Sequence, residues 1–178
     1  MKIFLLDDSP IVAKGIKVAM KPYHDIHVAT TLKDAAFCLE IKPGVEAFDL
    51  LLFDASLPQE IVIGIKGEVL YNDVFGYNGL LFLLNNLDIL SKHINHIAII
   101  TAFKNQIVTM ENINVLGEHF RIRLQKSKSR NELEKIIVKT GSNELYIFTV
   151  LDKGRNAIVT DINQFIERTT IAKTEREI

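Results

Sequence analysis

Disulfides and long apolar runs are absent from this sequence. It contains a single cysteine, Cys38, so no disulfide can form within the chain. No apolar run approaches the roughly 18 residues that a helix needs to cross a bilayer. The first apolar stretch, residues 3–6, is followed by acidic residues, which is not typical of a secretion signal. We therefore expect a protein of the reducing cytoplasm with no membrane partner.

A strong net charge is also absent. The chain has 21 Lys and Arg residues against 22 Asp and Glu residues, for a net charge of -1. This balance gives no reason to expect binding to nucleic acid or to an anionic membrane. The one basic run, residues 126–130, has no interleaved aromatic side chains and is more typical of a solvated helix start. We expect no nucleic-acid partner.

Short apolar stretches alternate with segments of helical periodicity through the first 140 residues. The expected strands are 2–6, 26–29, 48–54, 96–101 and 119–125, and the expected helices are 10–21, 32–39, 79–90, 106–116 and 131–139. Ser9 and Pro10 suit the start of the first helix, because Ser caps a helix well and Pro fits its first position. This alternation predicts an α/β protein with a parallel sheet and helices on both of its faces.

Polar residues follow the expected strands. Asp7 and Asp8 follow the first strand, whereas Asp54, Thr101 and Lys126 end or follow the third, fourth and fifth. Parallel sheets bind ligands at the carboxyl ends of their strands, so we expect a site there. Taken singly, each residue has a structural explanation: acidic residues favour a helix N-terminus, and a lone lysine is usually a solvated charge. Their joint occurrence favours a functional site.

Five features together resemble the receiver domain of two-component response regulators. They are LLDDSP at 5–10, LLFDASLP at 51–58, Gly79, IAIITA at 97–102, and Lys126. The resemblance covers roughly residues 1–140. It implies a flavodoxin-like, doubly wound (βα)5 fold with a five-stranded parallel sheet in the order 2-1-3-4-5, plus small extra elements.

The resemblance implies that Asp54 accepts a phosphoryl group from a histidine kinase or a phosphotransfer protein. It also implies a Mg²⁺ site in which Asp8 and Asp54 bind directly, Asp7 binds through water, and Ser56 offers its backbone carbonyl. Phosphoryl transfer depends on positioning and electrostatic stabilisation, and Mg²⁺ prefers oxygen ligands. A bound cation would explain why two carboxylates stand side by side at a strand end.

The same resemblance implies three phosphate-binding or switch residues, Thr101, Ala102 and Lys126. Two departures concern the lysine. Receivers usually have a proline after it, where this chain has Ser127. Lys128 is therefore an alternative, because residues two apart in an extended chain point to the same side. The aromatic switch residue usually lies three positions before the lysine, where this chain has Arg123.

The length of the chain also departs from the family. Nineteen residues separate Pro58 from Asn78, against roughly 2–6 for an ordinary strand-to-helix loop. We expect a small hairpin or flap in this insert, about 59–77. Residues 141–178 are expected to form a C-terminal extension, with a strand at 144–151 and then a helix. It would pack on the receiver domain, 1–140, or mediate self-association, with a homodimer as one outcome.

The leading hypothesis is a receiver that signals through altered binding to an unidentified downstream protein. It would be no enzyme beyond its own phosphorylation and dephosphorylation. One alternative is a pseudo-receiver that acts without phosphate. A less favoured alternative is a phosphatase of the haloacid-dehalogenase type, which needs a second acid two residues after its nucleophile. Asp54 is followed by Ala55 and Ser56 instead.

Overall fold

The computed structural model describes residues 1–40, 48–57, 62–63, 69–70, 78–102, 112–115, 118–126, 132–153 and 158–174. The strands are β1 Lys2–Leu6, β2 Asp25–Ala29, β3 Leu50–Asp54, β4 Val62–Ile63, β5 Val69–Leu70, β6 His96–Thr101, β7 Asn112–Val115, β8 Glu118–Gln125, β9 Glu134–Thr140 and β10 Leu145–Asp152. The helices are α1 Pro10–Met20, α2 Leu32–Leu39, α3 Asn78–Asn85, α4 Leu87–His93 and α6 Ile158–Thr174. None of these helices is both long and apolar enough to cross a membrane.

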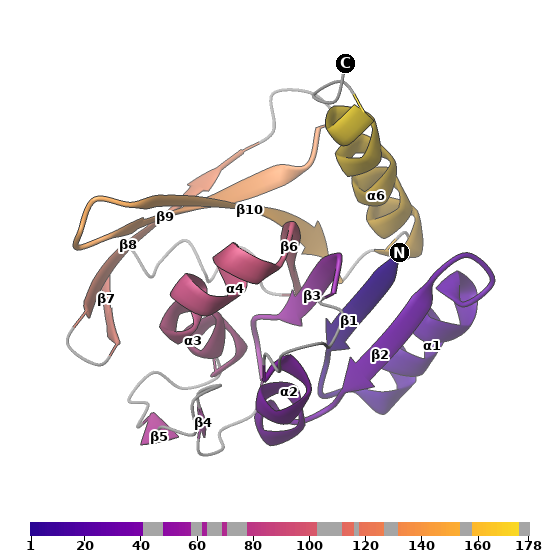
Figure 1. Ribbon diagram of the computed structural model, residues 1–178, viewed down its shortest axis with the longest axis horizontal. Coiled ribbons are helices and arrows are strands. Elements are labelled where there is room, and N and C mark those ends of the chain that lie inside the picture. The colour runs from indigo at the N-terminus through magenta and orange to yellow at the C-terminus, as the bar shows by residue number, and fades with distance from the viewer. Residues whose placement is uncertain are drawn as a thin grey trace.

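An eight-stranded mixed sheet organises the molecule, with strand order β2-β1-β3-β6-β10-β9-β8-β7. The first five strands of this order run parallel to their neighbours. From β10 outward, β9, β8 and β7 pair in antiparallel fashion. Helices α2, α3 and α4 cover one face of the sheet, and α1 and α6 lie on the other (Figure 1).

The central parallel strands β1, β3 and β6 are largely buried on both faces, as continuous apolar runs predict. Every residue of β3 is buried, which confirms the prediction for residues 50–54 of the expected strand 48–54; residues 48 and 49 precede the strand and are half-buried. In β1 the side chains alternate between two cores: Phe4 and Leu6 pack with α2 and α3, whereas Ile3 and Leu5 pack with α1. This double burial leaves polar groups on these strands only where the strands end.

Local signals fix the first two helices. The side-chain oxygen of Ser9 accepts a hydrogen bond from the backbone N–H of Val12, and Pro10 opens α1 as expected. The hydroxyl of Thr31 caps α2 by accepting from the N–H of Asp34 at 3.1 Å. The single helix expected over 79–90 is instead α3 and α4, because Asn86 interrupts it. Its buried side-chain amide donates to the carbonyl of Phe82 at 2.7 Å.

The second half of the chain corrects the prediction of two helices. The segment expected as the helix 131–139 is β9, and residues 112–115 of the expected helix 106–116 form β7. In β9, Ile136 and Val138 are buried while Lys135 and Lys139 are exposed, which is the two-residue period of a strand. β-Branched residues such as those at 136–138 also favour strands over helices.

The fifth parallel strand is a further correction. Residues 119–125 form a strand as expected, but β8 does not lie next to β6, because β10 occupies that position. The expected domain boundary at residue 140 falls inside the β9–β10 hairpin, where Asn143 adopts a positive φ of 69°. Residues 145–152 are therefore an integral strand, and α6 contacts both β10 and α1.

The insert at 59–77 is described only in part. β4 and β5 pair in antiparallel fashion as a separate two-stranded ribbon. β4 lies against α2 and α3, on the same face of the main sheet (Figure 1). The remainder of the insert lies outside the described residues.

A chain that ends at residue 140 is expected not to fold, although the sequence alone suggested a boundary there. The truncation removes β10, which joins the parallel and antiparallel halves of the sheet and buries Val150 and Leu151. Far-UV circular dichroism and urea unfolding provide the measurement, with a chain that ends at Thr174 as the control. Cooperative unfolding of the 1–140 chain would contradict this topology.

Candidate functional site

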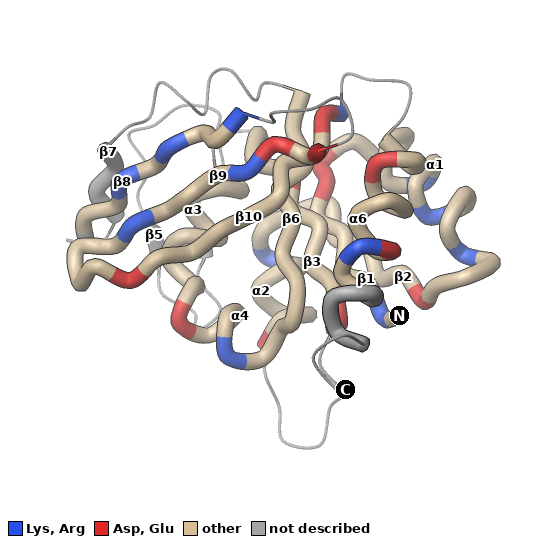
Figure 2. Tube along the Cα trace, turned by 90° about the horizontal axis from the view of Figure 1, so that it is seen from above, with Lys and Arg blue, Asp and Glu red and all other residues tan. Residues whose placement is uncertain are grey.

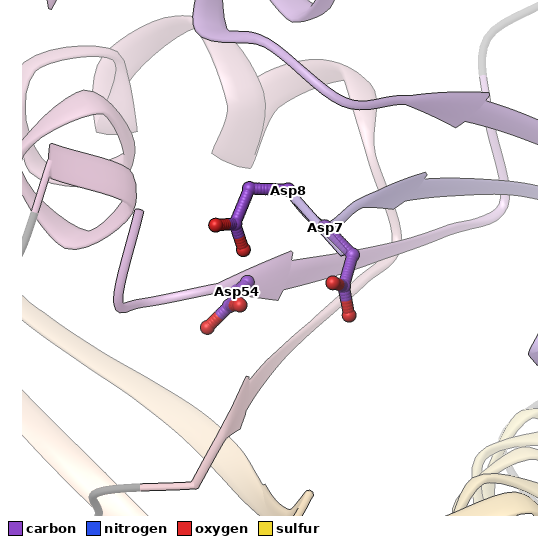
Figure 3. Close-up of side chains that lie close together, drawn as sticks. All are labelled: Asp7, Asp8 and Asp54. Carbon is purple, nitrogen blue, oxygen red and sulfur yellow. The ribbon is translucent and has the colours of Figure 1, made fainter. Parts of the chain in front are cut away.

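Three aspartates meet at the carboxyl edge of the parallel strands. Asp7 and Asp8 follow β1, and Asp54 ends β3, its parallel neighbour. One carboxylate oxygen from each lies within 4.8 Å of the others (Figure 3). Asp7 and Asp54 are buried, with exposed fractions of 0% and 2%, whereas Asp8 is exposed. Two buried carboxylates close to a third require compensation by donors and cations.

Backbone N–H groups orient the two buried carboxylates. The N–H of Ser9 donates to Oδ1 of Asp7 at 2.9 Å, and the N–H of Ser56 donates to Oδ1 of Asp54 at 3.0 Å. Each donor lies two residues after its acceptor, in the turn that follows the strand. The second oxygen of each carboxylate is therefore left to face a shared partner.

That partner is Lys153, a residue that the sequence analysis missed. Its Nζ lies 2.5 Å from Oδ2 of Asp54 and 3.0 Å from Oδ2 of Asp7. Lys153 directly follows β10, and its backbone N–H donates to the carbonyl of Thr101 at 2.9 Å. The parallel pairing of β10 with β6 thus brings this lysine to the same edge of the sheet as the aspartates.

The lysine assignment made from the sequence needs correction. Lys126 is exposed and follows β8, which β10 and β9 separate from β6. Lys128 lies outside the described residues. A sequence signal for Lys153 exists, because this lysine directly follows the largely apolar segment 145–152, which overlaps the expected strand 144–151. What failed was the choice of strand, since the order of strands in a sheet is not a local property of the sequence.

Thr101 and Ser56 add two hydroxyl groups to this edge. Thr101 ends β6 with no exposed surface, and its Oγ1 lies 3.5 Å from Oγ of Ser56. Ala102 follows Thr101 and is exposed. The roles given to the Ser56 carbonyl, Thr101 and Ala102 stay predictions, although all three residues lie beside the strand ends that carry the acids.

Burial controls the protonation of the central pair. Burial raises the pKa of Asp54 from 3.8 to about 6, although the hydrogen bond and charge of Lys153 and the N–H of Ser56 act in the opposite direction. Burial lowers the pKa of Lys153, but its contacts with Asp54 and Asp7 outweigh this effect and leave the pKa above its usual value. Near neutral pH the pair is therefore an ammonium beside an ionised carboxylate.

The donor set fits a hard divalent cation. The cluster holds three carboxylates, and one described ammonium contacts two of them, so the site carries an excess of negative charge. Oδ2 of Asp7 is buried, and its contact within the described chain is the ion pair with Lys153. Mg²⁺ binds through a few carboxylates while keeping several waters, and the exposure of Asp8 leaves one side of the cluster open to solvent.

Comparisons with known proteins gave structural matches only. No family model matches the sequence, and no curated protein matches it. The receiver domain of the Francisella response regulator 1452 is 22% identical over 60% of this chain and 72% of that chain, with a TM-score of 0.38. The BeF3-activated DrrB receiver domain is 17% identical over 57% of this chain and 65% of that chain, with a TM-score of 0.34.

Gly79 allows α3 to approach the site closely. A Cβ atom at this position would lie 1.8 Å from the backbone oxygen of Asp54, a distance that no side chain can occupy. The next residue, Leu80, donates its backbone N–H to the carbonyl of Ala55 at 3.3 Å. The start of α3 therefore packs directly on the backbone that carries Asp54, and only glycine permits this contact.

Gly79→Ala is expected to lower the free energy of unfolding by roughly 2 kcal/mol or more, because the backbone of β3 or α3 must move. Gly15 is the matched control. It lies in α1 with nothing within 4 Å of an added Cβ, so Gly15→Ala should raise the free energy of unfolding by about 0.5–1 kcal/mol. Urea unfolding measures both. Equal effects in the two variants would contradict the close approach of α3.

The raised pKa of Asp54 predicts a pH dependence of stability in metal-free protein. The folded state binds the proton more tightly than the unfolded state, so the free energy of unfolding falls as pH rises from about 4 to about 7. Asp54→Asn removes this contribution and is expected to stabilise the protein by ~1–2 kcal/mol above pH 7. Urea unfolding in EDTA gives the measurement. A gain that does not shrink toward pH 5 would contradict the assignment.

Proposed function

We propose that this protein is a phosphoacceptor receiver in which Asp54 takes a phosphoryl group from a phosphohistidine. One observation carries the proposal: Lys153 contacts both Asp54 and Asp7 at an edge of the sheet where Asp8 supplies a third carboxylate. An acid nucleophile, a cation-binding pair of acids and a fixed ammonium are the groups that phosphoryl transfer to a carboxylate needs. The donor would be a histidine kinase or a phosphotransfer protein.

In the proposed reaction, an Oδ atom of Asp54 forms a bond to phosphorus as the bond to the donor imidazole nitrogen breaks. The electron pair of that bond stays on the imidazole, which then takes up a proton. A bound Mg²⁺, held by Asp7, Asp8 and Asp54, would neutralise negative charge on the phosphoryl oxygens. Ionised Asp54 is available near neutral pH, because its pKa is about 6.

Lys153 and Thr101 are proposed to bind the phosphoryl group once it is attached. The ammonium of Lys153 already touches Oδ2 of Asp54, so a short movement would bring it to a phosphoryl oxygen. The hydroxyl of Thr101 lies on the same edge beside Ser56 and offers a further donor. Movement of these two groups would alter binding to a downstream protein, which is the proposed output.

Two alternatives are less well supported. A phosphatase of the haloacid-dehalogenase type needs an acid two residues after the nucleophile. That residue is Ser56, whose N–H donates to Asp54. A pseudo-receiver would assign the buried Asp54–Lys153 pair a structural role only, and it gives no role to the third acid, Asp8. The described site thus favours a phosphoacceptor that reacts once over a catalyst with turnover.

Phosphorylation is tested by incubating the protein with Mg²⁺ and acetyl phosphate, with intact mass spectrometry as the readout. The native chain is expected to gain one phosphoryl group, and Asp54→Asn is expected to gain none. Lys153→Ala should react at least about tenfold more slowly, because it removes the cation that contacts the nucleophile. Lys126→Ala is the matched control and should react like the native chain.

Each contrary result has a distinct meaning. No adduct on the native chain, together with no Mg²⁺ binding, would reject the phosphoacceptor and favour the pseudo-receiver. Repeated hydrolysis of a generic phosphoester would favour the phosphatase. A loss with Lys126→Ala that equals the loss with Lys153→Ala would contradict the assignment of the lysine.

A further inference from the structure

The antiparallel end of the sheet carries a face unlike the rest of the molecule. Along β8, β9 and β10, alternate side chains such as Phe120, Val138 and Phe148 point into the core under α3 and α4. The other set points away from that core. We call this second set the basic sheet face; it comprises Arg121, Arg123, Gln125, Lys135, Ile137, Lys139, Leu145, Ile147 and Thr149.

Helix α6 covers only the end of this region. Its residues Phe165 and Ile166 pack in the same core cluster as Leu151, near the end of β10. Closer to the start of that strand, Leu145 and Ile147 have exposed fractions of 60% and 54%. In Figure 1, α3 and α4 lie on one side of β8–β10, and no described helix covers the other side beyond α6.

The charge on this face is of one sign. Its four cations are Arg121, Arg123, Lys135 and Lys139. None of the positions on β8, β9 and β10 that point to this face carries an acidic residue. None of the four forms an ion pair within the described part of the chain. Blue segments run along β8 and β9 in Figure 2. Since the whole chain has a net charge of -1, this positive charge is a local concentration.

The register places cations and aliphatic side chains next to one another. Arg121 lies opposite Lys139, a pairing of like charges that costs stability unless a counter-charge binds. Lys139 lies opposite Leu145, and Ile137 lies opposite Ile147. Adjacent strands are about 4.8 Å apart and alternate residues about 6.8 Å apart, so the three aliphatic side chains form one compact cluster beside the cations.

We propose that the basic sheet face binds an acidic amphipathic helix of a partner protein. The apolar stripe of such a helix matches the Ile137, Leu145 and Ile147 cluster, and its Asp and Glu residues match the flanking cations. The free energy of binding would come from the aliphatic contact, while the charges would speed association and set the orientation. This inference does not depend on phosphorylation of Asp54.

Other occupants fit this face less well. Single-stranded nucleic acid binds on exposed aromatic side chains, but Phe120, Tyr146 and Phe148 occupy the alternate, inward positions of these strands. A two-fold contact with a second copy of this chain would press four cations against four cations. An interfacial membrane contact usually includes Trp or Phe anchors, and the basic sheet face has neither.

The test is a titration of the ¹⁵N-labelled full chain with a synthetic helical peptide of leucine and glutamate. Backbone amides of β8, β9 and β10 are expected to shift. The double variant Arg123→Glu and Lys139→Glu should weaken peptide binding at least about tenfold. Two cations that would attract the acidic side chains of the peptide become acids that repel them. Lys14→Glu with Lys17→Glu on α1 is the matched control, with the same charge change at exposed positions. It should bind like the native chain.

Further arms separate the possible occupants. Ile147→Ser should weaken peptide binding, whereas Asp54→Asn should leave it unchanged, which keeps this proposal separate from the proposed function. Circular dichroism checks that each variant is folded, and Arg123→Gln with Lys139→Gln replaces the charge reversal if that variant unfolds. The proposal is overturned if the peptide shifts no amides of these strands, or if the α1 control weakens binding equally. Tighter binding of oligothymidylate or of phosphatidylserine vesicles would also overturn it.

Discussion

The contact of Lys153 with Asp54 and Asp7 is the interaction on which the arrangement of this edge depends. Two carboxylates buried at adjacent strand ends repel each other, and water cannot screen them there. One ammonium between them offsets much of that repulsion. The same contact ties the end of β10 to the ends of β1 and β3. A single ion-paired group therefore connects strands from opposite ends of the sequence.

This constraint explains the position of β10. Its register with β6 sets Asp152 opposite Thr101, so that Lys153 emerges at the level of the aspartates. On its other edge, β10 pairs in antiparallel fashion with β9 and joins the outer strands to the parallel half. The strand that supplies the lysine thus also supports the basic sheet face. The two proposed sites share one rigid element, although they lie on different parts of it.

Predictions from the sequence succeeded where the signal is local. The apolar run of β3 and the Ser9–Pro10 start of α1 involve only neighbouring residues, and the structure has both. They failed in the second half, where β9 was expected to be a helix. Its apolar residues 136–138 are consecutive, so their spacing does not distinguish a helix from a strand. Pairing with β8 and β10 settles the question by burying Ile136 and Val138 and exposing the lysines on either side of them.

By itself, the sequence determined that Asp7, Asp8 and Asp54 end buried strands, because an apolar run that stops at an acid is visible in the residues. Tertiary structure alone decided which lysine joins them. Lys126 and Lys153 both directly follow a strand, and the local sequence does not decide between them. The choice depends on which strand pairs with β6, and that pairing follows from packing and hydrogen bonding among segments far apart in the chain.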